Sequence, residues 1–135
     1  MKYSVEKQDD YAIMTLAEEN LNSVKAPDLK SEFVVLKNQG IRNLILNLEI
    51  VKYVDSSGLS AILTGNRLWS DDEGLFVLTG VTHPSVKMLI NISRLDSVLD
   101  IKDNTPEAVK WIMMQTLRSE LSSEASATEE EGDEE

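Results

Sequence analysis

The fold of this chain is decided by residues 43–63, which read NLILNLEIVKYVDSSGLSAIL. The stretch opens with Asn43–Leu48, an almost continuous apolar run that is typical of a strand covered on both faces. A loop through Tyr53 and Val54 follows it. A helix is then predicted from about Ser57 to Trp69, and its inward face is expected to carry Leu59, Ile62, Leu63 and Trp69. A buried strand followed by an amphipathic helix indicates an α/β domain.

Upstream of this stretch, the pattern predicts a β-hairpin and a helix. Tyr3–Glu6 and Tyr11–Leu16 have strand-like patterns, and Asp9-Asp10 forms the turn between them. The polar segment Glu18–Lys25 is predicted to form turns. A helix is predicted to begin at Pro27 and Asp28 and to end at Gly40, because apolar residues recur at helical spacing: Leu29, Phe33, Val34 and Leu36.

Downstream, strands and helices continue to alternate. Leu75–Leu78 is predicted to be a buried strand, Pro84 starts a short helix with Val86, Leu89 and Ile90, and Val98–Ile101 is predicted to be an edge strand. Pro106 begins a last helix, whose inward residues are expected to be Val109, Ile112, Met113 and Leu117. This order predicts an α/β fold with a mixed four- to five-stranded sheet, opened by a β-hairpin and covered by about four helices.

Acidic residues are concentrated at the C-terminal end. The formal net charge is -11, from 24 acidic and 13 basic residues, and residues 124–135 hold seven of the acids and no base. Without this segment, 17 acids face 13 bases. We expect a domain over residues 1–121 and an acidic disordered tail over 122–135, because the tail has too little apolar surface to offset its ordering entropy. The tail could be a solubilising extension or a docking segment for a basic partner.

Composition argues against several classes of function. The chain has no cysteine, which excludes disulfides and a Cys-based zinc site. The acidic balance argues against nucleic acid as a partner, since binding it requires a basic face. The chain begins without an apolar leader and has no run of about 18 apolar residues, so we expect a cytoplasmic location and no membrane insertion.

Few residues could support catalysis. The one histidine, His83, precedes Pro84 in a predicted turn, where a solvated side chain is the usual case. Asp71-Asp72-Glu73 is interpreted as a solvated turn rather than a metal site, and Met113-Met114 as core or rim packing. No nucleotide-binding glycine fingerprint is present. We therefore expect no enzyme activity, no metal and no cofactor.

The segment Asp55-Ser56-Ser57-Gly58 joins the buried strand to the amphipathic helix. In α/β sheets, ligands and partners contact the carboxyl ends of strands, where loops and helix N-termini meet. Aspartate and serine also cap helices, because their side-chain oxygens accept hydrogen bonds from free N–H groups of the first turn. From these residues alone, the segment is either a helix cap or a binding loop.

From Asn43 to Trp69 the sequence resembles the STAS domain, the domain of the bacterial anti-sigma factor antagonists. The family pattern is an apolar strand, a short loop and then Asp-Ser-Ser-Gly-Leu at the start of a helix, here Asp55 to Leu59. The likeness extends to Gly74–Val81 and Pro84–Lys87, and covers roughly residues 3–118. Two positions depart from the family pattern: Glu19-Asn20-Leu21-Asn22 replaces Gly-x-Leu-Asp, and Arg94 replaces a glycine.

The resemblance implies a protein-binding domain that is switched by phosphorylation. Ser56 corresponds to the phosphorylated serine of the family, and Asp55, Ser57 and Gly58 belong to the same recognition loop. An anti-sigma factor that is also a serine kinase would bind the unmodified form, releasing a sigma factor, and would phosphorylate Ser56 with its own ATP. A metal-dependent serine phosphatase would reverse the mark. Asn22, Ser23 and Ser85 are further candidate contacts with the partner, because their predicted places lie near the same end of the sheet.

Two alternatives to this switch remain open. A STAS domain can act without phosphorylation, as a structural or regulatory part of a transporter or signalling complex, because a serine at the helix cap has a use in helix stability alone. An enzyme or small-ligand binder could use Ser56 or Asp55 as a nucleophile, but no histidine or cysteine lies near them in the sequence to act as a base. The sequence does not indicate the oligomeric state.

Overall fold

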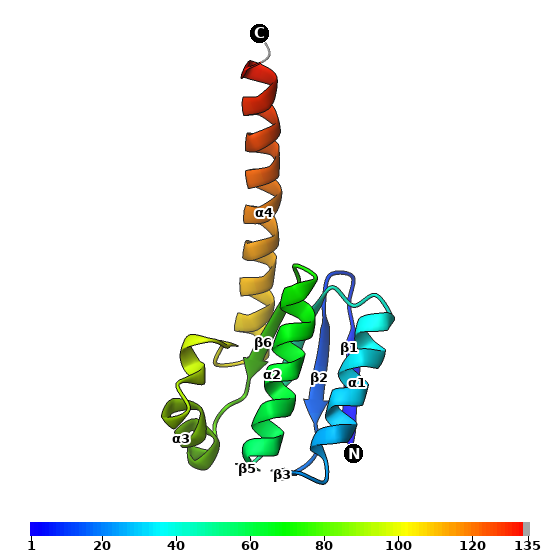
Figure 1. Ribbon diagram of the computed structural model, residues 1–135, viewed down its shortest axis with the longest axis vertical. Helices are drawn as coiled ribbons and strands as arrows, with labels where there is room; N and C mark the ends of the chain where they lie inside the picture. The colour runs from blue at the N-terminus through cyan, green and yellow to red at the C-terminus, as the bar shows by residue number, and fades with distance from the viewer. Residues whose placement is uncertain (134–135) are drawn as a thin grey trace.

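The computed structural model describes the backbone of residues 1–133 and the side chains of residues 1–122. Its main sheet has five strands in the order β1-β2-β4-β6-β7 (Figure 1). β1 is antiparallel to β2, and the other neighbouring pairs are parallel. This confirms the predicted mixed sheet opened by a hairpin. The strands are β1 (Tyr3–Lys7), β2 (Ala12–Leu16), β4 (Asn43–Asn47), β6 (Leu75–Thr79) and β7 (Asp100–Ile101).

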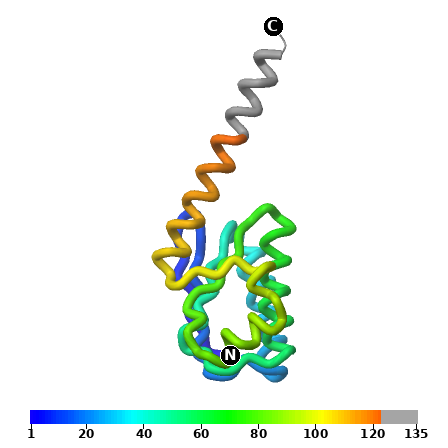
Figure 2. The backbone as a smooth tube through the Cα atoms, turned by 90° about the vertical axis from the view of Figure 1, so that its left-hand side faces the viewer, coloured from blue at the N-terminus to red at the C-terminus, as the bar shows by residue number. Residues whose placement is uncertain are grey.

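Helices cover both faces of the sheet. α1 (Ala26–Asn38), α2 (Ser56–Asp71) and α3 (Pro84–Ile92) share one core with one face, whereas α4 (Thr105–Asp133) packs on the other (Figures 1 and 2). A short 3-10 helix, η1 (Leu95–Ser97), precedes β7. Alternating side chains of β4 enter both cores, because Leu44 and Leu46 belong to the first core and Ile45 to the second. This arrangement explains the continuous apolar run of Asn43–Leu48.

Three aromatic rings hold α1 and α2 against β6. The rings of Phe33, Trp69 and Phe76 lie with their centroids 5.6 to 6.0 Å apart. Gly65 makes room for them, since a Cβ atom there would lie 2.7 Å from ring carbons of both phenylalanines. Trp69 Nε1 also donates a hydrogen bond to the carbonyl of Ile41 at 3.1 Å. These contacts fix α2 on the sheet and so determine where its N-terminus lies.

The structure contains a second sheet that the sequence pattern does not predict. β3 (Asn20–Leu21) pairs in parallel with β5 (Tyr53–Val54). The expectation that Glu18–Lys25 forms only turns is wrong, because Leu21 lies in a strand and its side chain is fully buried. Its strand partner lies far along the chain, and a local pattern carries no signal for such a pairing.

The last helix is less buried than its pattern predicts. Ala108 and Ile112 are buried against the sheet, but Met113 and Leu117 are 53% and 55% exposed, which corrects their expected inward positions. Met114 is also exposed, so the Met113-Met114 pair does not pack in the core. Met113 and Leu117 border an open groove rather than a packed core, and Figure 1 shows that α4 continues past the end of the sheet.

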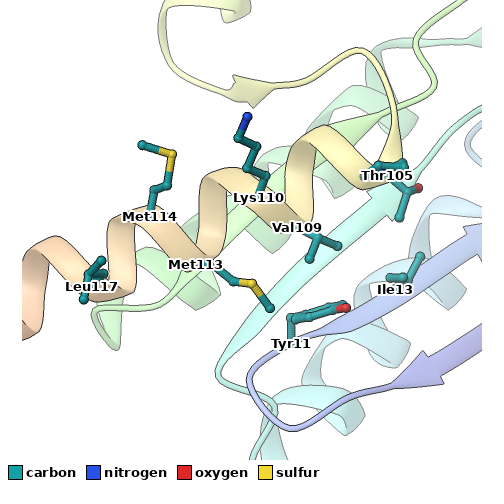
Figure 3. Close-up of a pocket in the computed structure, with 9 residues that line it drawn as sticks. Tyr11, Ile13, Thr105, Val109, Lys110, Met113, Met114 and Leu117 are labelled. Carbon is teal, nitrogen blue, oxygen red and sulfur yellow. The ribbon is translucent and has the colours of Figure 1, made fainter.

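An apolar groove of about 600 Å³ lies between α4 and β2. In Figure 3 the side chain of Met113 points across this groove towards Tyr11, and Val109 and Ile13 lie beside it. Lys110 and Met114 point away from the sheet in the same view. The groove lies on the opposite face of the sheet from α1 and α2.

The predicted acidic tail, residues 122–135, begins where the description of side chains ends. Ser122 is exposed, and the surroundings of the residues after it lie outside what the structure describes. The tail and both roles considered for it therefore stay predictions.

Arg94 adopts a left-handed backbone conformation, with φ 59° and ψ 25°. Glycine, which the family pattern has here, adopts this conformation at the least cost. A residue with a Cβ atom pays roughly 1–2 kcal/mol, whereas glycine loses about 0.5–1 kcal/mol through its greater freedom in the unfolded chain. We expect Arg94→Gly to raise the free energy of unfolding by about 0.5–1 kcal/mol in urea denaturation. Arg94→Ala keeps the Cβ atom, and an equal gain from it would contradict the backbone explanation.

Candidate functional site

Asp55 caps α2. Its backbone is extended (φ -96°, ψ -175°), and its Oδ1 accepts a hydrogen bond from the Gly58 N–H at 2.8 Å. Its Oδ2 accepts a second one from the Ser23 N–H at 3.2 Å. The helix thus begins at Ser56, one residue earlier than predicted. A single carboxylate fixes both the first turn of α2 and the loop that leads into α1.

Removing this carboxylate should destabilise the domain. We expect Asp55→Ala to lower the free energy of unfolding by about 1–2 kcal/mol, because it leaves two backbone N–H groups without their acceptor. Asp55→Asn keeps one acceptor oxygen and should lose less than half as much. Urea denaturation of the two variants measures both values, and an unchanged midpoint for Asp55→Ala would contradict the capping role.

Gly58 allows α2 to begin directly against β3. A Cβ atom at this position would lie 2.2 Å from the carbonyl oxygen of Leu21. The same oxygen accepts a hydrogen bond from the Asp55 N–H at 3.2 Å. Gly58 is buried, so its visible role is to let the helix approach the strand rather than to present a surface.

Ser56 is exposed on the first turn of α2, beside a recess of about 300 Å³. Among the described side chains and backbone groups, none is hydrogen-bonded to its hydroxyl. Because α1 and α2 pack side by side, the recess has walls from both helices and from the loop before α1 (Figure 1). Its lining residues are Ser23, Ala26, Pro27, Lys30, Ser56, Ser57 and Ser60.

The loop before α1 brings only one of its two predicted residues to the recess. Ser23 is exposed and lines the recess. Asn22 is half-buried, and its Oδ1 accepts hydrogen bonds from the Val24 and Lys25 N–H groups at 3.1 and 3.3 Å, so it holds the loop.

At the start of this loop, the Lys25 ammonium, helped by the Lys2 N–H, holds the pKa of the Glu18 carboxyl below its ordinary value.

Ser85 lies at the same end of the sheet, but its hydroxyl is used within the protein. The hydroxyl donates to the carbonyl of Lys52, and its oxygen lies 3.0 Å from Nδ1 of His83, which must then be the donor. His83 precedes α3 and contacts the ring of Tyr53 at a centroid distance of 5.5 Å. The solvated turn predicted for His83 is wrong, since the half-buried imidazole ties α3 to β5.

The STAS domain family model matches residues 2–108 of the chain. The chain belongs to the STAS domain family. The crystal structure of a Thermotoga maritima protein assigned as an anti-sigma factor antagonist is similar to this STAS domain, with 25% sequence identity and a TM-score of 0.72. The match covers 82% of this chain and 94% of that chain.

Two other solved structures have the same fold. The Bacillus cell fate determinant SpoIIAA in its phosphorylated form is 20% identical, with a TM-score of 0.64 over 82% of this chain and 99% of that chain. A sulfate transporter family protein from Wolinella succinogenes is 18% identical, with a TM-score of 0.63 over 76% of this chain and 84% of that chain. At these identities the likeness shows the fold alone.

The sequence pattern does not place three residues at this end of the STAS domain, although the structure does. Lys30 and Ser60 line the recess with Ser56, and Tyr53 is 56% exposed just before Asp55. Helical periodicity predicts which side of α1 faces the core, but it does not show that Lys30 lies opposite the start of α2. Of these three residue types, tyrosine is the one that is enriched in protein–protein interfaces.

Other candidate sites in the STAS domain are less informative. No helix in the described part of the chain combines the length and the apolar character needed to cross a bilayer. No group of three or more His, Asp or Glu side chains there could hold a metal ion. Of the Asp71-Asp72-Glu73 segment, Asp72 forms an ion pair with Lys37 at 2.9 Å, as an exposed side chain at the end of α2.

Proposed function

We propose that this STAS domain is an anti-sigma factor antagonist, and that phosphorylation of Ser56 switches its binding to an anti-sigma factor with serine kinase activity. The exposed Ser56 hydroxyl on the first turn of α2, beside a recess, carries the proposal. The likeness to the Thermotoga antagonist over most of both chains supports this class of function. In the cytoplasm, the unmodified form would bind the anti-sigma factor and so release a sigma factor. A serine phosphatase would restore the unmodified form by removing the phosphate from Ser56. The domain would serve as binding partner and kinase substrate, without enzyme activity of its own.

The proposed switch needs only local electrostatics. Serine is small and neutral, so a partner can cover it at little desolvation cost. Phosphorylation adds about -1.5 to -2 charges and three acceptor oxygens. Burying that charge against a partner without a cation costs at least a few kcal/mol, which corresponds to about a hundredfold in affinity. Because the Ser56 side chain is exposed, the fold itself need not change.

The cap of α2 helps to choose between the switch and its first alternative. A STAS domain that acts without phosphorylation would keep a serine here for helix capping. Asp55 supplies the cap, and Ser56 is the first helical residue. Helix capping therefore gives no reason for a serine at this position, which favours a role for its hydroxyl outside the fold.

The nucleophile alternative has no histidine or carboxylate base among the described residues that line the recess. The ring Nδ1 of His83 is engaged by Ser85. None of the residues that line the recess in the described structure is a histidine, an aspartate or a glutamate. A serine nucleophile needs an adjacent base, so the arrangement favours Ser56 as an acceptor of phosphate from another protein.

Phosphorylation by the native kinase tests the proposal. The protein is incubated with the kinase and ATP, and its intact mass is then measured. We expect one added phosphate on the wild type and on Ser57→Ala, and none on Ser56→Ala. Absence of added phosphate on the wild type would favour the unphosphorylated alternative, and a phosphate on Ser56→Ala would place the modification elsewhere.

A further inference from the structure

The end of α2 cannot by itself neutralise a phosphoryl group on Ser56. A helix N-terminus attracts anions through its free N–H groups and its dipole. In α2, however, the Gly58 N–H is already bound by the Asp55 carboxylate at 2.8 Å. That carboxylate is adjacent to Ser56 in the chain. A dianion at Ser56 would therefore lie beside a negative charge, at a helix end that is already partly neutralised.

Lys30 places a cation at the same recess. It is half-buried on α1 and lines the recess together with Ser56 and Ser60 of α2. It is the one charged residue among those that line the recess in the described structure. Unlike Lys25, Lys37 and Lys52, it forms no ion pair with a described carboxylate. Its ammonium group is therefore available to an anion.

We propose that the recess is an intramolecular phosphate site, in which the Ser56 phosphoryl group turns towards α1 and pairs with Lys30. This inference rests on the proposed function, because it concerns the same serine. The recess, at about 300 Å³, has room for a phosphoryl group. Ser23, Ser57 and Ser60 also line the recess, and their hydroxyls are of the kind that donates hydrogen bonds to phosphoryl oxygens.

Such a pair would act on the phosphorylated protein both before and during contact with a partner. In the free phosphorylated protein, the ion pair with Lys30 stabilises the dianionic phosphate on Ser56, and it also stabilises the first turn of α2. A partner that covers the recess would have to bury the pair or break it, and both cost free energy. If binding breaks the pair, the free energy of the pair adds to the loss of affinity that the phosphate itself causes.

The test uses the full chain with phosphoserine incorporated at position 56 during translation, so that no kinase is needed. A ³¹P NMR titration measures the pKa of the second ionisation of the phosphate, which is ordinarily about 6. A nearby cation favours the dianion, so Lys30→Met should raise this pKa by about 0.3–0.7 relative to wild type. Lys30→Arg keeps a cation and should retain the wild-type value.

Lys110→Met is the matched control, because it removes the same charge from α4, whose core lies on the other face of the sheet. It should change the phosphate pKa by less than about 0.1, since salt screens distant exposed charges. A wild-type pKa for Lys30→Met, or an equal rise for Lys110→Met, would overturn the phosphate site. If Lys30→Met fails to fold by circular dichroism, Lys30→Gln replaces it in the same titration.

The two proposals can fail separately. Phosphoserine is introduced without the kinase, so a negative titration leaves the kinase assay untouched. Conversely, a wild-type protein that no kinase modifies can still show the pKa change caused by Lys30.

Discussion

Ser56→Asp should weaken binding to the native anti-sigma factor kinase by about a hundredfold. The substitution places a permanent carboxylate at the exposed first turn of α2, where a partner would cover a neutral hydroxyl. Burying an unpaired charge in that contact costs a few kcal/mol, and each 1.4 kcal/mol is about tenfold in the dissociation constant. Isothermal titration calorimetry of the purified proteins measures the change directly.

The same substitution should leave the domain folded. The Ser56 hydroxyl has no hydrogen-bond partner within the described structure, and an acid in the first turn of a helix is compatible with its dipole. Far-UV circular dichroism should therefore match that of the wild type. Ser4→Asp, on the exposed edge strand β1, adds the same charge elsewhere and should bind normally. Wild-type affinity for Ser56→Asp, or equal losses in both variants, would contradict the switch.

Gly58→Ala should destabilise the domain by about 2–3 kcal/mol. The new Cβ atom would lie 2.2 Å from the Leu21 carbonyl oxygen, a backbone atom that cannot rotate away as a side chain would. Relief requires α2 and β3 to separate, which weakens the Asp55 N–H hydrogen bond to that oxygen. Overpacking of this kind typically costs 1–3 kcal/mol. Urea denaturation followed by circular dichroism measures the loss.

The sign of the stability change in Gly58→Ala distinguishes close packing against β3 from helix propensity alone. In an open helix, Gly→Ala is stabilising by up to about 1 kcal/mol through helix propensity. Ser60→Ala, at an exposed position one half-turn further along α2, should therefore change stability by less than about 0.5 kcal/mol. A stabilising Gly58→Ala would show that α2 and β3 are not in close contact. Amide hydrogen exchange at Leu21 and Ser23 should also accelerate in Gly58→Ala, because their loop depends on the first turn of α2.

Local patterns predict most of the helices and strands. β4 and α2 lie within about two residues of their predicted limits, because a continuous apolar run and an N-terminal Asp are both local signals. The β3–β5 pair has no such signal, since two-residue strands are too short to show a period. The exposure of Met113 on α4 is likewise invisible in the sequence, because its spacing fits an inward face and only the tertiary structure shows that it borders an open groove.

The sequence alone determined the alternating order of strands and helices and the position of the Asp55–Gly58 segment at the start of a helix. Both follow from hydrophobic periodicity and capping chemistry, which act over a few neighbouring residues. Only the tertiary structure decided that Asp55 rather than a serine forms the cap, that Ser85 is engaged internally, and that Lys30 of α1 lines the same recess as Ser56. These facts depend on how whole helices pack on the sheet, and the packing is set by contacts such as those of Gly58 and Gly65, whose partners lie far away in the chain.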